Sequence, residues 1–207
     1  MPDRNGALSA TAFIRQAHAR RWVQSRSIPT DLTTTRLLLR PLAPGAAVAL
    51  LDGDRDRAAA LVAADLAEAW PADDLRAVLI PQARLGGDLR FGLWTVIERA
   101  SRTVVGSAGF LGAPDARGII EIGFDVVPDR RRRGYATEAA STLAGWVRTQ
   151  PEVSGVAARC REDNDGSAGV LRAVGFAERT RQNGVIYWRL PAGASQGADN
   201  GSPSVAV

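Results

Sequence analysis

A basic loop followed by small residues carries the clearest chemistry in this sequence of 207 residues. An apolar segment ends at Pro128, the four arginines Arg130 to Arg133 come next, and a helical pattern opens near Ala136. Gly134 and Ala136 lack bulk, so the backbone there can turn tightly and approach a ligand. The first amides of a helix have no intrahelical partners, and the helix dipole adds positive potential. The loop therefore predicts a diphosphate site, with a simple polar turn as the alternative.

Composition excludes several other kinds of site. The only cysteine, Cys160, and the only histidine, His18, cannot form an intramolecular disulfide or a zinc site of soft ligands. All 26 basic residues are arginine, so the chain has no lysine for a P-loop, a Schiff base or a general base. The pI of about 10.4 accompanies a net charge of only +4, because arginine does not titrate in the usual range. The high pI is therefore weak evidence for nucleic-acid binding.

The elements that must position the loop alternate between strands and helices. Periodicity and turn residues predict strands at 36–40, 91–98, 103–111, 119–127, 155–161 and 185–190. They predict helices at 46–51, 56–68, 73–85, 137–149 and 167–174. Antiparallel strands followed by a strand–helix–strand unit indicate a mixed α/β (α+β) sheet in one domain, residues 31–191. We expect Cys160 and the tryptophans at 70, 94, 146 and 188 to serve as core or pocket wall.

The two ends of the chain differ from this domain. Residues 1–30 form a basic extension in which a helix is expected from about Ala12 to Gln24. Residues 192–207 hold small and polar residues with no periodic apolar face, which predicts a disordered tail. No apolar stretch reaches the ~18 residues that span a bilayer, so we expect no transmembrane segment, and a cytoplasmic protein.

Several motifs together resemble the GNAT superfamily of N-acetyltransferases. Residues 131–136, Arg-Arg-Arg-Gly-Tyr-Ala, fit the (Gln/Arg)-x-x-Gly-x-(Gly/Ala) acyl-CoA signature of that family. Residues 35–41 look like the opening strand of its ribosomal-protein N-terminal acetyltransferase branch, and Glu121 to Phe124 resemble the Glu-Ile-Gly-Tyr strand of that branch. Asn164 to Ser167, followed by Gly175-Phe176, resemble its Asn-x-x-Ser…Gly-Phe segment.

The resemblance implies a single GNAT-like domain with a central splayed sheet, mixed but mostly antiparallel and flanked by helices. Acetyl-CoA, as a co-substrate, would lie in the opening, and no metal is implied. Asn164 would hydrogen-bond the pantetheine or orient the substrate, or alternatively cap the following helix. The pantetheine would pair with the strand backbone, and the pyrophosphate would sit on the loop. These implied contacts fall on Val126, Val127, Arg131, Arg132, Arg133, Gly134, Tyr135, Ala136 and Thr137.

The implied reaction is direct attack of an amine on the thioester carbonyl. An amine with a pKa near 10 is mostly protonated at neutral pH, so a base or a water relay must remove a proton. Glu121 occupies the strand position where the family often places a base, and Asp125 competes because it lies on the same strand face. Leu171 stands where many relatives have a tyrosine acid, which leaves Ser167 or water to protonate the leaving thiolate.

The predicted function is acetyl-CoA-dependent N-acetylation of a primary amine, either a protein N-terminus or a small-molecule amine. A longer acyl donor and a homodimer remain open, and neither a membrane nor a nucleic-acid partner is expected. The net acidic segment between Asp52 and Asp88 would help form the acceptor pocket and attract a cation. The alternative from another class is a non-catalytic acyl-CoA sensor or scaffold, with residues 1–30 binding RNA or a partner.

Overall fold

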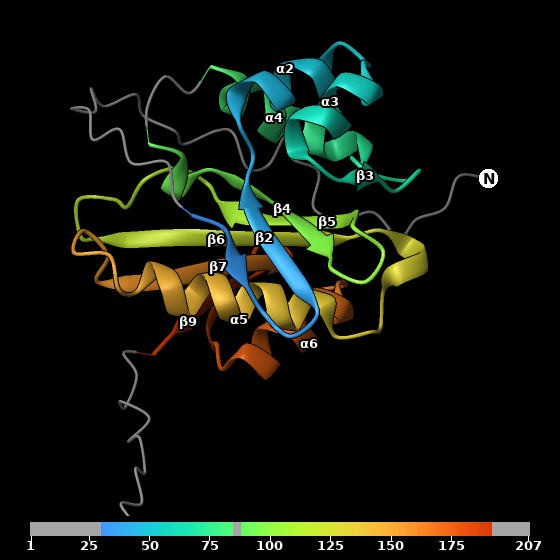
Figure 1. Cartoon of the computed structure of the whole chain (residues 1–207). Helices are drawn as coiled ribbons and strands as arrows, with labels where there is room; N and C mark the ends of the chain where they lie inside the picture. The colour runs from blue at the N-terminus through green and yellow to red at the C-terminus, as the bar shows by residue number, and fades with distance from the viewer. Residues whose placement is uncertain (1–29, 85–87, 192–207) are drawn as a thin grey trace, which may run out of the picture.

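A single β-sheet forms the centre of the fold. The computed structural model describes residues 30–84 and 88–191. Within these residues nine strands pair, eight of them in the order β1-β2-β4-β5-β6-β7-β9-β8, while β3 pairs with β5 (Figure 1). All neighbours are antiparallel except β6 with β7 and β3 with β5. The strands are β1 (Leu32–Thr33), β2 (Leu37–Pro41), β3 (Asp65–Leu66), β4 (Leu93–Glu98), β5 (Thr103–Phe110), β6 (Ile119–Val126), β7 (Gly155–Arg161), β8 (Ala177–Gln182) and β9 (Val185–Leu190).

Helices cover the sheet in two groups (Figure 1). In the first group α5 packs against β2, β5, β6 and α6, and in the second α2, α3 and α4 pack together, with α4 against β4. None of the helices in the described ranges has the length and apolar content that crossing a membrane requires. The helices are α2 (Pro44–Leu51), α3 (Arg55–Val62), α4 (Arg76–Ala83), α5 (Tyr135–Val147) and α6 (Asp165–Val174), with short 3-10 turns η2 (Asp73–Leu75), η3 (Leu89–Phe91) and η4 (Pro128–Arg130).

The central strands β4 and β5 are buried along almost their whole length, because helices lie over both of their faces. On the α5 side the Trp94 ring meets the Trp146 ring edge-on, with centroids 5.1 Å apart. The buried face of α5 includes three alanines, Ala139, Ala140 and Ala144. Their small side chains let the helix approach the sheet closely. Of the four tryptophans expected in the core, three are buried and Trp146 is half-buried against it.

The sheet parts between β6 and β7. Their parallel pairing covers only three residue pairs, Ile119–Glu121 with Gly155–Ala157. Beyond Glu121, β6 runs on to Val126 and β7 runs on to Arg161 without pairing to each other. The mixed, mostly antiparallel sheet flanked by helices is therefore confirmed, and the opening lies where β6 leads into the basic loop.

Several local predictions were wrong, and the two-residue strands β1 and β3 were not expected. The helix expected over 56–68 ends at Val62, because Ala63 adopts the left-handed conformation (φ 56°) and the chain turns into β3. The helix expected over 73–85 is divided into η2 and α4. Strand β8 was not expected, since its side chains are all exposed and show no alternation. The helix expected from about Ala12 to Gln24 and the disordered tail expected over 192–207 lie outside the described residues.

Buried Gln82 ties the second helical group to the sheet. Its side-chain amide donates to the Leu42 carbonyl at 2.6 Å, and its amide oxygen accepts from the Leu93 N–H at 3.0 Å. Both backbone groups therefore depend on one side chain, which lies on α4.

We expect Gln82→Met to lower the free energy of unfolding by about 2–4 kcal/mol, since it leaves two buried backbone groups without partners. Gln182→Met on exposed β8 is the control and should change stability by less than about 0.5 kcal/mol. Urea denaturation monitored by circular dichroism measures both. Equal losses in the two variants would contradict this role of Gln82.

Candidate active site

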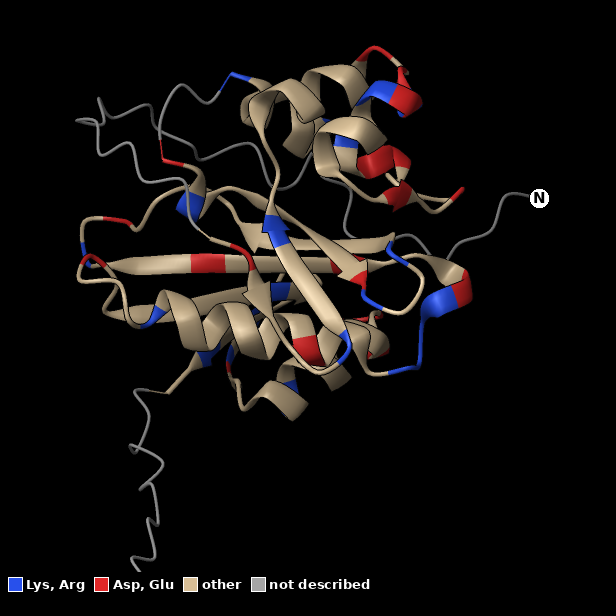
Figure 2. Cartoon of the chain, in the orientation of Figure 1, with Lys and Arg blue, Asp and Glu red and all other residues tan. Residues whose placement is uncertain are grey.

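The diphosphate loop, residues 127–134, connects β6 to α5. It contains η4, and Arg132 and Gly134 both have positive φ, at 56° and 80°. Gly134 is the N-cap of α5, and no side chain caps the first amides of that helix. The basic stretch lies at this connection, at the right of Figure 2. Uncapped amides at the positive end of the helix dipole can bind an anion.

An outer cavity of about 690 Å³ opens on this loop. Its other wall is the N-terminal part of α6. Of the residues predicted to bind the cofactor, Val127 and Arg133 lie outside its lining. Those that line it are Val126, Arg131, Arg132, Gly134, Tyr135, Ala136, Thr137 and Asn164. The structure thus brings together most of the predicted cofactor residues.

The strand backbone at Val126 and Val127 is already engaged. The Val126 carbonyl accepts from Arg131 Nε at 2.9 Å. The Val127 N–H donates to the Val105 carbonyl, and the Val127 carbonyl accepts from the Arg130 N–H. Strand-like pairing of pantetheine with the Val126 carbonyl would therefore use its second lone pair or displace the Arg131 guanidinium.

An inner cavity of about 130 Å³ lies at the opening between β6 and β7. Asp74, Leu75 and Val78 from the α4 side line it opposite residues of β5, β6 and β7. The acidic segment 52–88 thus contributes directly to this wall. The inner and outer cavities share four lining residues: Phe124, Asp125, Asn164 and Ser167.

Asp125 is the carboxylate at this junction. The Ser107 N–H donates to its Oδ1 at 3.1 Å, and Trp70 Nε1 donates to the Ser107 hydroxyl at 2.8 Å. Burial, with the nearby charge of Asp74, raises the pKa of Asp125 to about 6, and hydrogen bonds from Ser107 offset part of that rise. A carboxylate with this pKa is charged at neutral pH and can still accept a proton.

Glu121 occupies a different environment on the same strand. Its Oε1 lies 2.7 Å from Arg159 Nε, in an ion pair that joins β6 to β7. Burial raises the pKa of Glu121, and the charge and hydrogen bond of Arg159 offset part of the rise. Glu121 lies outside the lining of both cavities, whereas Arg159 lines the inner one.

The Asn164 segment forms the far wall. Asn164 Oδ1 accepts from the Ser167 N–H at 2.9 Å and caps α6, so the capping alternative is observed. Ser167 lines both cavities, and buried Leu171 lines the inner one, where it has no proton to give. Cys160 is buried beside Trp188, and burial raises the pKa of its thiol, which fits a small apolar wall residue.

Sequence reasoning missed Asp74 and Ser107. Asp74 belongs to the acidic segment, but nothing in its spacing shows that it faces β6. Ser107 could have been found from the paired strands, because it lies opposite Asp125 in the β5–β6 register. Within residues 30–84 and 88–191, no three His, Cys, Asp or Glu side chains gather closely enough to hold a metal ion.

A parted sheet with an uncapped helix N-terminus beside the opening can hold a ligand that carries a phosphate group. Residues 36–177 match the family model described as an acetyltransferase (GNAT) domain. The chain belongs to this family and is an acyltransferase enzyme.

Known proteins agree with this assignment. The chain is 35% identical to the uncharacterized N-acetyltransferase YjdG of Bacillus subtilis over 126 residues, 58% of this chain and 73% of that protein. Its fold is similar to the ribosomal-protein-S5-alanine acetyltransferase of Vibrio fischeri, with a TM-score of 0.55 and 15% identity over 78% of this chain and 96% of that one. It is also similar to the microcin C7 self-immunity acetyltransferase MccE solved with acetyl-CoA and AMP, with a TM-score of 0.50 and 16% identity over 75% and 90%.

We expect Gly134→Val to abolish the rise in melting temperature that acetyl-CoA gives the native enzyme. At φ 80° a side chain strains the backbone, and a Cβ would lie 3.3 Å from Arg36 Nη2, so the side chain of valine would fill space beside the helix N-terminus and disturb the loop conformation that glycine permits. Ligand binding to the folded state alone raises the melting temperature, which thermal unfolding with and without acetyl-CoA measures.

Gly53→Val is the matched control. Gly53 has φ 78° and nothing within 4 Å of an added Cβ, and it lies between α2 and α3. Both variants should lose about 1–3 kcal/mol of stability from backbone strain, but only Gly134→Val should lose the acetyl-CoA response. A normal response in Gly134→Val would overturn the placement of the diphosphate.

Proposed function

We propose that this enzyme transfers the acetyl group of acetyl-CoA to a primary amine by direct attack in a ternary complex. The amine nitrogen forms a bond to the thioester carbonyl carbon, and the carbon–sulfur bond breaks as the thiolate leaves. The observation that carries the proposal is the position of Asp125, which lines both the outer cavity beside the diphosphate loop and the inner cavity. An acceptor and a thioester can meet there.

Asp125 is the proposed proton acceptor. The acceptor arrives mostly as an ammonium ion and must lose a proton before its lone pair can attack. A base works best when its pKa is near the operating pH, and the pKa of Asp125, about 6, meets that condition. Glu121, the base favoured by its motif position, stays a prediction, but its ion pair with Arg159 makes it the weaker candidate.

The inner cavity favours a cationic acceptor. Asp74 and Asp125 both line it, and burial raises the pKa of each carboxyl. Asp74 lies in η2, next to Asp73, and Figure 2 shows further acidic residues around α3 and β3, in the same helical group. A negative potential there attracts an ammonium ion. Because the inner cavity is small, it would receive only the reacting end of a protein N-terminus or a small-molecule amine.

The departing thiolate needs a proton of its own. The Ser167 hydroxyl adjoins both cavities and sits in the first turn of α6, where the helix dipole favours negative charge. We assign this role to Ser167, or to a water that it holds, as a relay that passes to the thiolate the second proton that the attacking nitrogen loses as the amide forms. The proton that Asp125 has accepted returns to solvent after product release.

Asp125→Asn should reduce kcat by about 10²–10⁴-fold, because it keeps the shape but removes the base. Glu121→Gln is the matched control on the same strand face and should reduce kcat by less than about tenfold. CoA release with a panel of amine acceptors measures both. The reverse result would assign the base to Glu121, and acetyl-CoA binding without CoA release from any amine would favour the sensor alternative.

The pH profile gives an independent check. Asp125 must be ionised to act, so kcat/KM should fall as pH drops through about 6 and level off above it. Because the charge of Asp74 raises the pKa of Asp125, Asp74→Asn should move this acid limb to lower pH. An acid limb that stays in place in Asp74→Asn, or survives in Asp125→Asn, would show that another group titrates.

A further inference from the structure

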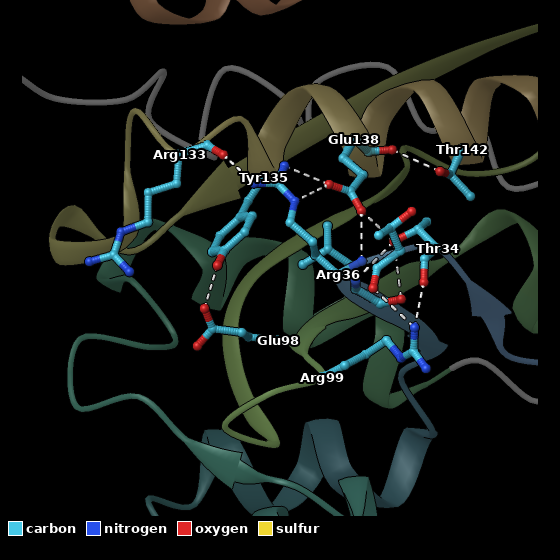
Figure 3. A network of polar contacts seen from close by, with 10 residues as sticks. Thr34, Arg36, Glu98, Arg99, Arg133, Tyr135, Glu138 and Thr142 are labelled. Carbon is cyan, nitrogen blue, oxygen red and sulfur yellow. Dashed lines mark hydrogen bonds and ion pairs between the residues drawn. The ribbon is translucent and has the colours of Figure 1, made fainter.

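The turn between β1 and β2 reaches across to the diphosphate loop. Arg36 follows this turn, 97 residues before Arg133 in the sequence. Its Nη1 donates to the Arg133 carbonyl at 2.7 Å, and its Nε donates to Glu138 Oε2 at 2.7 Å (Figure 3). The Arg36 guanidinium therefore forms hydrogen bonds to the chain on both sides of Gly134, the last residue before α5.

The turn holds Glu138 by further hydrogen bonds. The Arg36 N–H donates to Glu138 Oε1 at 3.2 Å, and the Thr34 hydroxyl donates to the same oxygen at 2.5 Å. Arg36 Nη2 completes the ion pair at 2.6 Å from Oε2. Burial acts to raise the pKa of Glu138, but the hydrogen bonds from Thr34 and Arg36 hold it below its ordinary value. The Glu138 carboxylate therefore stays ionised and points toward the turn between β1 and β2.

The first residue of α5 is held from the same side. The Arg36 guanidinium lies over the Tyr135 ring, 4.8 Å from its centroid. The Tyr135 hydroxyl donates to Glu98 at the end of β4 (Figure 3). The Ser101 hydroxyl donates to the same carboxylate. Tyr135 is thus packed and hydrogen-bonded away from the reacting centre, which fits a structural role for its ring.

The negative charge of Glu138 bears on how the start of α5 can bind a pyrophosphate. Glu138 lies in the first turn of α5, the helix end that would receive the pyrophosphate of acetyl-CoA. An unpaired carboxylate there would repel that dianion. The ion pair with Arg36 compensates the charge of Glu138. The hydrogen bond from Arg36 to the Arg133 carbonyl holds a loop in which Arg132 and Gly134 have positive φ.

We propose that Arg36 is a positioning residue for acetyl-CoA, which holds the diphosphate loop in its binding conformation and neutralises Glu138. The proposal rests on the proposed function, because it assumes that this loop holds the pyrophosphate. A preorganised loop binds more tightly, since its ordering is completed before the ligand arrives. Arg36 itself need not touch the acyl group or the acceptor.

The test compares Arg36→Leu with a matched control, Arg40→Leu. Arg40 lies four residues further along, on β2, and makes an ion pair of comparable geometry with Asp31. Its remaining guanidinium contact is to the Val62 carbonyl at the end of α3 rather than to the diphosphate loop. The two donors are acetyl-CoA and acetylpantetheine, which lacks the pyrophosphate. Titration of CoA, kcat and KM for both donors, and the melting temperature are measured for every variant.

Arg36→Leu should weaken CoA binding and raise KM for acetyl-CoA about tenfold, as expected for one lost charge-assisted hydrogen bond. The kcat at saturating acetyl-CoA and the kcat/KM for acetylpantetheine should stay within about twofold of the native values. Arg36→Lys should lie between, because an ammonium cannot reproduce the planar fork of contacts. Arg40→Leu should bind CoA normally.

Two results would overturn the proposal. The first is native CoA binding by folded Arg36→Leu, or by Arg36→Lys should the leucine variant fail to fold. The second is an equal loss with both donors, which would show a general effect on the fold. If the native enzyme itself does not bind CoA, the proposed function fails instead.

Discussion

The parting of β6 from β7 after three residue pairs is the constraint on which the rest of the site depends. A fully paired sheet would close the space between the strands and leave no cavity there. Because the strands separate, β6 delivers the chain into the diphosphate loop and α5, while β7 delivers it to Asn164 and α6. The two helix N-termini end up on opposite walls of one cavity, and only that of α6 is capped by a side chain of its own N-cap residue.

The same parting separates two carboxylates of one strand into different roles. Glu121 is the last residue of β6 that pairs with β7, and it is close enough to β7 to form an ion pair with Arg159. Asp125, two alternations further along, faces the open part of the sheet and receives hydrogen bonds from Ser107. A carboxylate paired with a guanidinium is a weaker base than a carboxylate whose pKa is raised by burial and by a neighbouring acid. Position relative to the parting point, more than residue type, distinguishes the ion-pair residue from the proposed base.

Local sequence signals predicted the parts of the site that local chemistry determines. Gly134, the arginines and the following helix form a single stretch, and the predicted loop lies where expected. The sequence favoured Glu121 over Asp125 by its motif position alone, because a period of two places both on one face and says nothing of where pairing stops. Likewise the Arg36–Glu138 pair joins residues 102 apart, beyond any local pattern. Strand β8 was missed although Asn183-Gly184, both with positive φ, is a strong hairpin signal.

We expect the thioester at the junction of the two cavities, within reach of Asp125, and a crystal structure of the enzyme with acetyl-CoA would locate it. In that complex the pyrophosphate should lie on the amides at the start of α5 and the acetyl group between β6 and β7. The Asp125 carboxylate should be in direct or single-water contact with the space that the amine must occupy. An acetyl group outside that opening, or closer to the Glu121 carboxylate than to the Asp125 carboxylate, would contradict this placement.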